Sequence, residues 1–262
     1  MCLALLALDA HPAYAVVIAA NRDEHHARPT APAAWWKEGW IAGRDLSAGG
    51  TWLAVTRAGR FALVTNVREP GFMETGARSR GTLVTRAVAE MSWPAESVAG
   101  IAATGAEYHG FNLIVGDLVT SYWGSNRAQG SRGLAPGIHG LSNAALDTPW
   151  PKVQRSKAAL AAWCTSRANN VEALFAALGD RTLAADALLP ATGVSLEWER
   201  RLSAPFIVGE GVGYGTRSST IVTLGRDGSA RFVERTFDPA GHQIGEVEER
   251  FALATALFVQ RA

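Results

Sequence analysis

The sequence predicts an α+β fold in which helices pack outside antiparallel sheets. Short apolar runs typical of strands occur in the first half of the chain and again in the last third, and segments with apolar residues at helical spacing lie between them. Two buried sheets between two helical layers, a four-layer αββα sandwich, would bury every one of these runs. No Pro/Ser-rich linker, charge block or repeat divides the chain, so we expect residues 1–262 to form one domain.

The first half of the chain begins with two runs, 2–8 and 14–20, separated by the turn sequence Asp9-Ala-His-Pro12. Both runs are almost entirely apolar, which is typical of strands that are buried on both faces. The same patterns predict, in chain order, strands at 51–56 and 61–65, helices at 80–91 and 95–104, and a hairpin of strands at 111–115 and 118–123.

The second half begins with the longest predicted helix, 149–164, which Asp147 or Thr148 caps. A shorter helix over 171–178 is capped by Asn170. Turn sequences then separate three strands, at 217–224, 231–237 and 245–251.

Composition excludes several classes of protein. The 25 Lys and Arg residues are balanced by 24 Asp and Glu residues, whereas a nucleic-acid or anionic-membrane surface favours a basic excess. No apolar stretch approaches the roughly 20 residues that cross a bilayer. The apolar amino terminus lacks the positive leading region of a signal peptide and is broken at Asp9. We therefore expect a cytoplasmic protein with no nucleic-acid partner and no stable membrane insertion.

A cysteine directly follows Met1, at the start of the first predicted strand. Removal of Met1 would leave Cys2 with a thiol and a free α-amine, and an α-amine with a pKa of about 7.7–8.0 can accept the proton of the thiol. The alternative is that Cys2 is a small buried hydrophobic residue. The only other cysteine, Cys164, has no metal-ligand or disulfide spacing to Cys2, so we expect no metal site.

Four polar residues, Asn21-Arg-Asp-Glu24, follow the second apolar run. Strand alternation puts Asn21 and Asp23 on one face and Arg22 on the other. The point where a buried strand emerges is a common place for binding groups. The alternative is a solvated strand end with an Arg22–Glu24 surface pair, which contributes little to stability.

Met1-Cys2 together with Asn21-Arg-Asp-Glu24 resembles the NRDE family, also called the transport and Golgi organization protein 2 family. The resemblance implies an amino-terminal-nucleophile hydrolase fold, which is a four-layer αββα sandwich. Further segments agree and span nearly the whole chain in the order of the family: Gly49-Gly-Thr-Trp-Leu53, Leu63-Val-Thr-Asn66, Arg78-Ser-Arg-Gly-Thr-Leu-Val84, Gly110-Phe-Asn-Leu113, Gly140-Leu-Ser-Asn143 and Gly215-Thr-Arg-Ser-Ser219.

Within that fold the chain is similar to choloylglycine hydrolases and penicillin V acylases, which cleave linear amides with an amino-terminal cysteine. The resemblance implies that Cys2 is the nucleophile and that Asp23 binds its freed amine. Asn66 resembles the oxyanion donor of those enzymes, although asparagine is also common in turns. The implied catalytic set is Cys2, Asp23, Asn66, Asn143 and Arg217, with Asn21 and Arg22 as substrate-binding residues, and we expect the catalytic set to converge.

One residue departs from the pattern of those enzymes. The arginine that leads their motif falls on Ala20, and Arg22 occupies the variable position, facing the other way from Asp23. The cation that stabilises the thiolate would then be Arg217 or a displaced Arg22. A thiol without a nearby cation has a pKa of about 8.5 and is mostly protonated at neutral pH.

The sequence thus predicts a hydrolase that acts on a linear amide or thioester of a small acyl molecule and requires no cofactor. The alternative is a non-catalytic binder or carrier of haem or acyl-coenzyme A, because family members are associated with haem trafficking and lipid homeostasis. An aromatic pocket flanked by Arg22 and Arg217 would suit the carboxylates or phosphates of such ligands. A third possibility is a scaffold with an inherited but inactive site.

We predict that Met1 is removed and that Cys2 is the reactive thiol, because only an amino-terminal cysteine combines nucleophile and base. Intact-mass measurement and alkylation of the purified protein test this. Retention of Met1, or faster alkylation of Cys164 than of Cys2, would contradict the mechanism.

Overall fold

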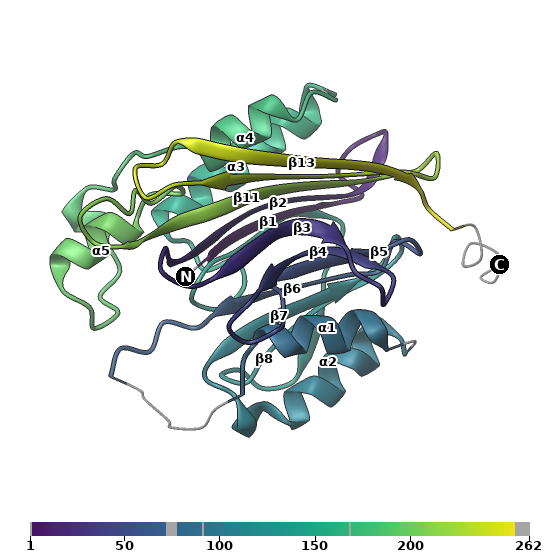
Figure 1. Ribbon diagram of the computed structural model, residues 1–262, viewed down its shortest axis with the longest axis horizontal. Coiled ribbons are helices and arrows are strands. Elements are labelled where there is room, and N and C mark those ends of the chain that lie inside the picture. The colour runs from purple at the N-terminus through teal and green to yellow at the C-terminus, as the bar shows by residue number, and fades with distance from the viewer. Residues whose placement is uncertain (1, 72–77, 91, 168, 255–262) are drawn as a thin grey trace.

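Two antiparallel sheets lie face to face in the computed structural model, which describes residues 2–71, 78–90, 92–167 and 169–254. Figure 1 shows α3 (Pro151–Thr165) and α4 (Glu172–Leu178) on the outer side of one sheet, and α1 (Gly81–Ala89) and α2 (Pro94–Ala103) on the outer side of the other. The four layers follow the order helices, sheet, sheet, helices, which confirms the predicted αββα sandwich.

The first sheet has six strands, and its central strands carry the polar string that follows the second apolar run. β1 pairs antiparallel with β2 along the whole length of β1, so that Cys2 lies opposite Arg22 and Leu8 opposite Val16. The strands in spatial order are β10 (Gly137–Leu141), β1 (Cys2–Leu8), β2 (Tyr14–His25), β11 (Tyr214–Gly225), β12 (Ser229–Phe237) and β13 (Gln243–Ala252).

The second sheet has seven strands, which follow one another in sequence order. These are β3 (Thr30–Trp35), β4 (Trp40–Asp45), β5 (Leu53–Thr56), β6 (Phe61–Asn66), β7 (Phe111–Gly116), β8 (Ser121–Ser125) and β9 (Ser131–Gly133). The remaining helices of the described ranges are α5 (Leu196–Leu202) and two short 3-10 turns, η1 (Gly105–Glu107) and η2 (Asp186–Leu188). Within those ranges, no helix is both long enough and apolar enough to cross a membrane.

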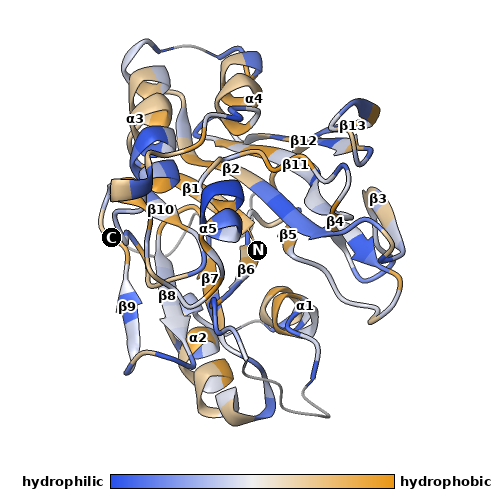
Figure 2. Ribbon diagram, turned by 90° about the vertical axis from the view of Figure 1, so that its left-hand side faces the viewer, coloured by the Kyte–Doolittle hydropathy of each residue, from blue (hydrophilic) through white to orange (hydrophobic). Residues whose placement is uncertain are grey.

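The hydrophobic core is divided into three layers by the two sheets. Between the sheets, Leu6 of β1 packs in one cluster with Phe61 of β6. On the outer face of the first sheet, Leu5 of β1 lies in a second cluster with Leu160 of α3, and a third cluster lies beneath α1 and α2. Figure 2 shows hydrophobic residues along the central strands β1, β2 and β7. Because β1 and the first part of β2 are buried on both faces, residues 3–8 and 15–20 are continuously apolar.

The sequence did not predict β3, β4, β9, β10 or α5. In β3, Pro32 interrupts the pattern, and the register with β4 shifts between Ala31 and Ala34. The third helix begins at Pro151 rather than at 149, because Trp150, the residue before this proline, is extended with ψ 144°. Neither Asp147 nor Thr148 caps the helix, and Asp147 adopts a left-handed conformation with φ 60°. Its carboxylate instead accepts the Gly140 N–H at 2.9 Å.

We predict that Leu6→Ala lowers the free energy of unfolding by about 2–5 kcal/mol, because it leaves a cavity between the two sheets. Leu188→Ala is the matched control, since that leucine is 64% exposed, and it should change the free energy by no more than about 0.5 kcal/mol. Urea denaturation of both variants measures the difference. Equal effects would contradict the placement of Leu6 in the core.

Candidate active site

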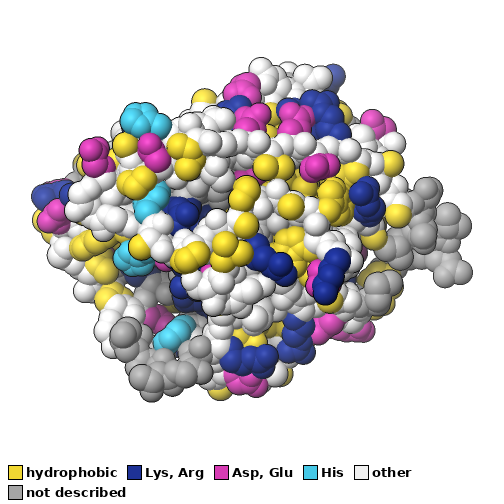
Figure 3. Space-filling model, in the orientation of Figure 1, with side chains coloured by type: hydrophobic (Ala, Val, Ile, Leu, Met, Phe, Trp, Pro, Cys, Tyr) yellow, Lys and Arg dark blue, Asp and Glu magenta, His cyan; other side chains and the backbone are white. Residues whose placement is uncertain are grey.

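A pocket of about 330 Å³ lies at the end of the two sheets where β1 begins and β2 and β6 end. Figure 3 shows Lys, Arg and His side chains gathered around a hollow on the side where the amino terminus lies in Figure 1. Its wall combines residues of both sheets and their loops, among them Cys2, Arg22, Asp23, Trp52, Asn66 and Arg80.

Cys2 and Arg22 lie directly opposite each other on paired strands and both line the pocket. The guanidinium of Arg22 stacks 4.3 Å from the ring centroid of Trp52 and donates to Thr30 Oγ1 at 3.2 Å. Among the described residues no carboxylate forms an ion pair with Arg22, although the side chain is buried. As strand alternation predicts, Arg22 and Asn21 face opposite sides of the first sheet. Arg22 faces the second sheet, and Cys2 lies on that same side. Of the two arginines that the sequence offered as the cation near the thiol, the structure thus places Arg22 beside Cys2 on the pocket wall.

Asp23 lines the pocket from β2, and its carboxylate is buried. Its Oδ1 accepts from Thr216 Oγ1 at 2.7 Å, and its backbone carbonyl accepts from the hydroxyl of Tyr214 at 3.2 Å. Burial raises the pKa of Asp23, while the nearby charges of Lys152 and Arg22 oppose that increase. The carboxylate is thus fixed through Oδ1 to Thr216 of β11, one residue beyond the strand partner of Cys2.

Asn66 and Asn143 are neighbours, but only Asn66 lies on the pocket wall. The buried Asn143 donates from Nδ2 to the backbone oxygen of Asn66 at 2.8 Å, and its own backbone oxygen accepts from the N–H of Arg68 at 2.8 Å. The preceding residue, Ser142, donates from Oγ to the carbonyl of Cys2 at 3.0 Å. Asn143 therefore braces the end of β6, and Ser142 ties the same loop to the start of β1.

The structure does not bring Asn21 into the pocket. Its Nδ2 donates to the backbone oxygens of Leu178 and Pro205, both at 2.9 Å, and its Oδ1 accepts from Ser219 Oγ at 2.6 Å. These bonds use both of its donors and hold the loops near α4 and α5 against the first sheet. The substrate-binding role expected for Asn21 does not fit this buried position.

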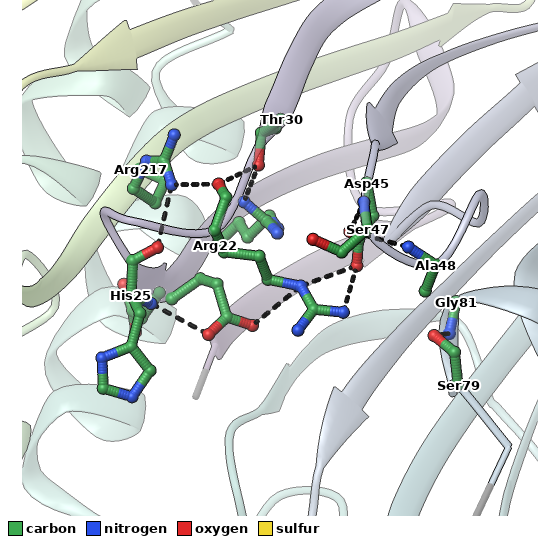
Figure 4. Close-up of polar contacts among 12 residues, drawn as sticks. Arg22, His25, Thr30, Asp45, Ser47, Ala48, Ser79, Gly81 and Arg217 are labelled. Atoms are coloured by element: carbon green, nitrogen blue, oxygen red, sulfur yellow. Dashed lines mark hydrogen bonds and ion pairs between the residues drawn. The ribbon is translucent and has the colours of Figure 1, made fainter.

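Arg217 also lies outside the Cys2 pocket, contrary to the expected convergence. It is the extra residue of a bulge in β11, because Thr216 pairs with Asp23 while Ser218 pairs with Arg22. Its guanidinium donates to the backbone oxygens of His25, His26 and Arg28 at 2.9–3.2 Å. Figure 4 shows Arg217 on the far side of this loop from Asp45 and Gly81. We therefore assign Arg217 to the support of the loop after β2.

The second cysteine is shielded from reaction. Cys164 lies in α3 within the cluster that includes Leu160 and Trp163. Burial raises the pKa of the Cys164 thiol to about 11, so it remains protonated at neutral pH.

The comparison with known proteins decides the family. The model of the family Transport and Golgi organisation 2 matches residues 1–239. The chain belongs to this family. It is 33% identical to the Transport and Golgi organization protein 2 homolog of Homo sapiens over 257 residues, covering 90% of this chain and 93% of that one. The homolog of Bos taurus is also 33% identical over 259 residues, with the same coverage.

A solved structure shows a similar fold at much greater sequence distance. The mutant C2A conjugated bile acid hydrolase from Clostridium perfringens aligns with a TM-score of 0.52 and 8% identity, covering 97% of this chain and 92% of that one. The structural likeness establishes a fold of the amino-terminal-nucleophile hydrolase type. Because the sequence identity is only 8%, it says nothing about the reaction.

Two glycines, Gly50 and Gly81, explain how a residue that was not predicted for the site comes to lie on the pocket wall. A side chain on Gly50 would lie 2.5 Å from the backbone of Gly81, so these two segments touch backbone to backbone. The N–H of Thr51 donates to the Gly81 oxygen at 3.2 Å. This contact places Arg80, the residue before Gly81, on the pocket wall. The sequence did contain a signal for Arg80, because this arginine lies in the string Arg78-Ser-Arg80, which is part of a segment that carries the family resemblance.

Arg80 is partly buried and donates to the backbone oxygen of Gly110 at 3.2 Å. Burial lowers its pKa, and its attraction to Cys2 opposes that decrease. In the described part of the chain it has no ion-pair partner. Arg28 differs, because Asp45 lies 2.8 Å from its Nη2 and neutralises it. Arg22 and Arg80 are thus the pocket arginines whose charge is not balanced by a carboxylate in contact.

Glu234 lies buried beside this region, between the sheets. Its Oε1 accepts the N–H of Ala33 in β3 at 2.7 Å, and its Oε2 accepts from Thr220 Oγ1 at 3.4 Å. Burial raises the pKa of Glu234 to about 7, against the opposing effects of these bonds and of Arg22.

We predict that Glu234→Gln becomes progressively more stable than the parent as pH rises from 4.5 to 8. Between pH 4.5 and about 7 the folded parent retains a proton that the unfolded chain releases, so the parent loses stability over this interval and its stability levels off above it. A pKa raised from 4.5 to about 7 corresponds to about 3 kcal/mol. Urea denaturation at several pH values measures the difference, and a difference independent of pH would show that Glu234 is not protonated in the folded state.

Proposed function

We propose that this chain is an amino-terminal cysteine hydrolase that cleaves a linear amide or thioester of a small acyl molecule. The observation that carries the proposal is the position of Cys2, in a pocket whose wall includes the unbalanced cations of Arg22 and Arg80. The thiolate is the reactive form of cysteine, and nearby cations favour it. The hydrolase-type fold supports the proposal, although fold alone does not establish a reaction.

In the proposed reaction, removal of Met1 frees the α-amine of Cys2, and this amine takes the proton of the thiol. The sulfur attacks the acyl carbon and forms a tetrahedral intermediate whose oxyanion accepts a hydrogen bond from the Asn66 amide, worth about 3–4 kcal/mol. The C–N or C–S bond then breaks, and the ammonium of Cys2 returns its proton to the leaving amine or thiol.

The acyl group now forms a thioester with Cys2. The α-amine accepts a proton from a water molecule, which attacks the thioester and releases the carboxylic acid and the thiol. Asp23 holds the amine in place, and Asn143 acts through its bond to Asn66 rather than on the substrate. The cavity of about 330 Å³ is at the lower end of the range for small-molecule sites, which fits a small acyl group.

A second candidate function is that of a carrier for an anionic ligand, for which haem and acyl-coenzyme A are the proposed examples. The specific observation that favours it is again the pair Arg22 and Arg80, since arginine binds carboxylates and phosphates well. Either ligand is larger than the cavity, so only its acidic or acyl end would enter. No other cofactor is needed for either function.

We predict that Cys2→Ala abolishes hydrolysis of acyl amides and thioesters and leaves substrate affinity within a few-fold of the parent. The reason is that alanine has no nucleophile, while the oxyanion donor Asn66 acts chiefly in the transition state. Turnover of a panel of acyl amides and thioesters, together with binding by calorimetry, measures both effects. Cys164→Ala is the matched control and should retain full turnover, because that thiol lies in the core.

Turnover that persists in Cys2→Ala would contradict the hydrolase. The carrier would replace it if no substrate of the panel is cleaved while haem or acyl-coenzyme A binds the parent and Cys2→Ala equally. In that case Arg22→Met or Arg80→Met should weaken binding by about 1.5–3 kcal/mol, the range for a hydrogen bond to a charged group.

A further inference from the structure

A buried ammonium lies behind the pocket, in a position that the proposed reaction does not use. Lys152 occupies the first turn of α3 and is only 1% exposed. Within the described residues its Nζ has neither a hydrogen-bond acceptor nor an ion-pair partner. An unpaired ammonium is costly to bury, so its retention here requires a reason other than stability.

Three ionisable groups near the start of β1 act on the charge of Lys152. Asp23 of β2 and Cys2 of β1 attract the ammonium, while Arg68 repels it. Arg68 is itself occupied, because its Nη1 lies 2.6 Å from Glu199 in α5 and its guanidinium stacks 4.7 Å from the Trp150 ring. Burial lowers the pKa of Lys152 to about 8, and the attraction of Asp23 opposes this decrease.

Strand alternation puts the Asp23 side chain on the face of the first sheet that α3 and Lys152 cover, away from the face of Arg22. Leu5 of β1 and Val17 of β2 face α3, and Asp23 lies on the same face of β2 as Val17. Lys152 therefore approaches Asp23 from the helical side, whereas the pocket wall with Arg22 is on the other side of the sheet. It does not line the pocket and would not touch a substrate.

We propose that Lys152 is a positioning residue for the Cys2 nucleophile: its ammonium offsets the charge of Asp23, favours the thiolate and keeps the freed α-amine unprotonated. This inference rests on the proposed function. A positive charge near a thiol favours loss of the thiol proton, and the same charge disfavours a proton on a neighbouring amine. Asp23 alone would hold the amine as an ammonium, which could not act as a base.

The proposal is tested without a known substrate, by the rate of Cys2 alkylation with iodoacetamide between pH 6 and 10. The measurement uses protein that carries Cys164→Ala and whose loss of Met1 is verified by intact mass. Lys152→Met should move the alkylation midpoint upward by about one pH unit, which slows alkylation at pH 7 about tenfold. The difference in alkylation rate between the parent and Lys152→Met should become smaller above about pH 8, where the Lys152 ammonium of the parent loses its proton.

Two matched variants separate this effect from a structural one. Lys152→Arg keeps the charge and should restore most of the parent profile. Lys157→Met removes a lysine from the same helix, one that pairs with Asp147, and should leave the midpoint unchanged. A purely structural role would lower the melting temperature of Lys152→Met without moving the midpoint, and that result would overturn the proposal.

If Lys152→Met does not fold by circular dichroism, Lys152→Gln takes its place with the same expected shift. A midpoint in the parent at or above that of a free thiol, about pH 8.5, overturns the proposal without any variant. If neither the parent nor any variant shows turnover but Lys152→Met still shifts the alkylation midpoint, the hydrolase is refuted and the role of Lys152 is not. If the parent shows turnover but Lys152→Met leaves the alkylation midpoint unchanged, only the role of Lys152 is refuted.

Discussion

The antiparallel pairing of β1 with β2 is the constraint on which the rest of the site depends. It sets Cys2 opposite Arg22, and strand alternation then fixes which side of the sheet each neighbour faces. Arg22 shares the inter-sheet side with Cys2, while Asp23 faces the helices, where it attracts the ammonium of Lys152 without pairing with it. A shift of one residue would exchange these two environments and bury the wrong charge on each face. The long apolar pairing from Leu3 to Leu8 fixes the register, so the hydrophobic core positions the chemistry.

Much of this arrangement follows from the sequence, because it depends on local patterns. The apolar runs predicted β1 and β2, helical spacing predicted α1 to α4, and the layering followed from which faces were apolar. Alternation also correctly separated Arg22 from Asn21. Strands β3 and β4 were missed because Pro32 and a register shift break the period-two pattern on which a strand is recognised.

The parts of the site that sequence could not predict depend on distant contacts. A single extra residue in β11 turns Arg217 toward the loop after β2, and no local pattern marks that bulge. Arg80 reaches the pocket only because Gly50 and Gly81 allow two backbones to touch, although they are far apart in the chain. Similarly, Asn143 is committed to the backbone of Asn66, which is visible only once the two loops are adjacent. The sequence therefore identified several residues of the site, but it did not predict the residues that each of them contacts.

Several buried charges gather at one end of the first sheet. Asp23, Lys152 and the ion pair of Arg68 with Glu199 all lie at the end of the first sheet where Cys2 begins, each with little exposure to water. Hydrophobic residues of similar size would usually make such an interior at least as stable. Such clusters of buried charge gather at active sites, where they set the protonation states of a nucleophile and a base, so this cluster supports the proposed hydrolase over an inactive scaffold.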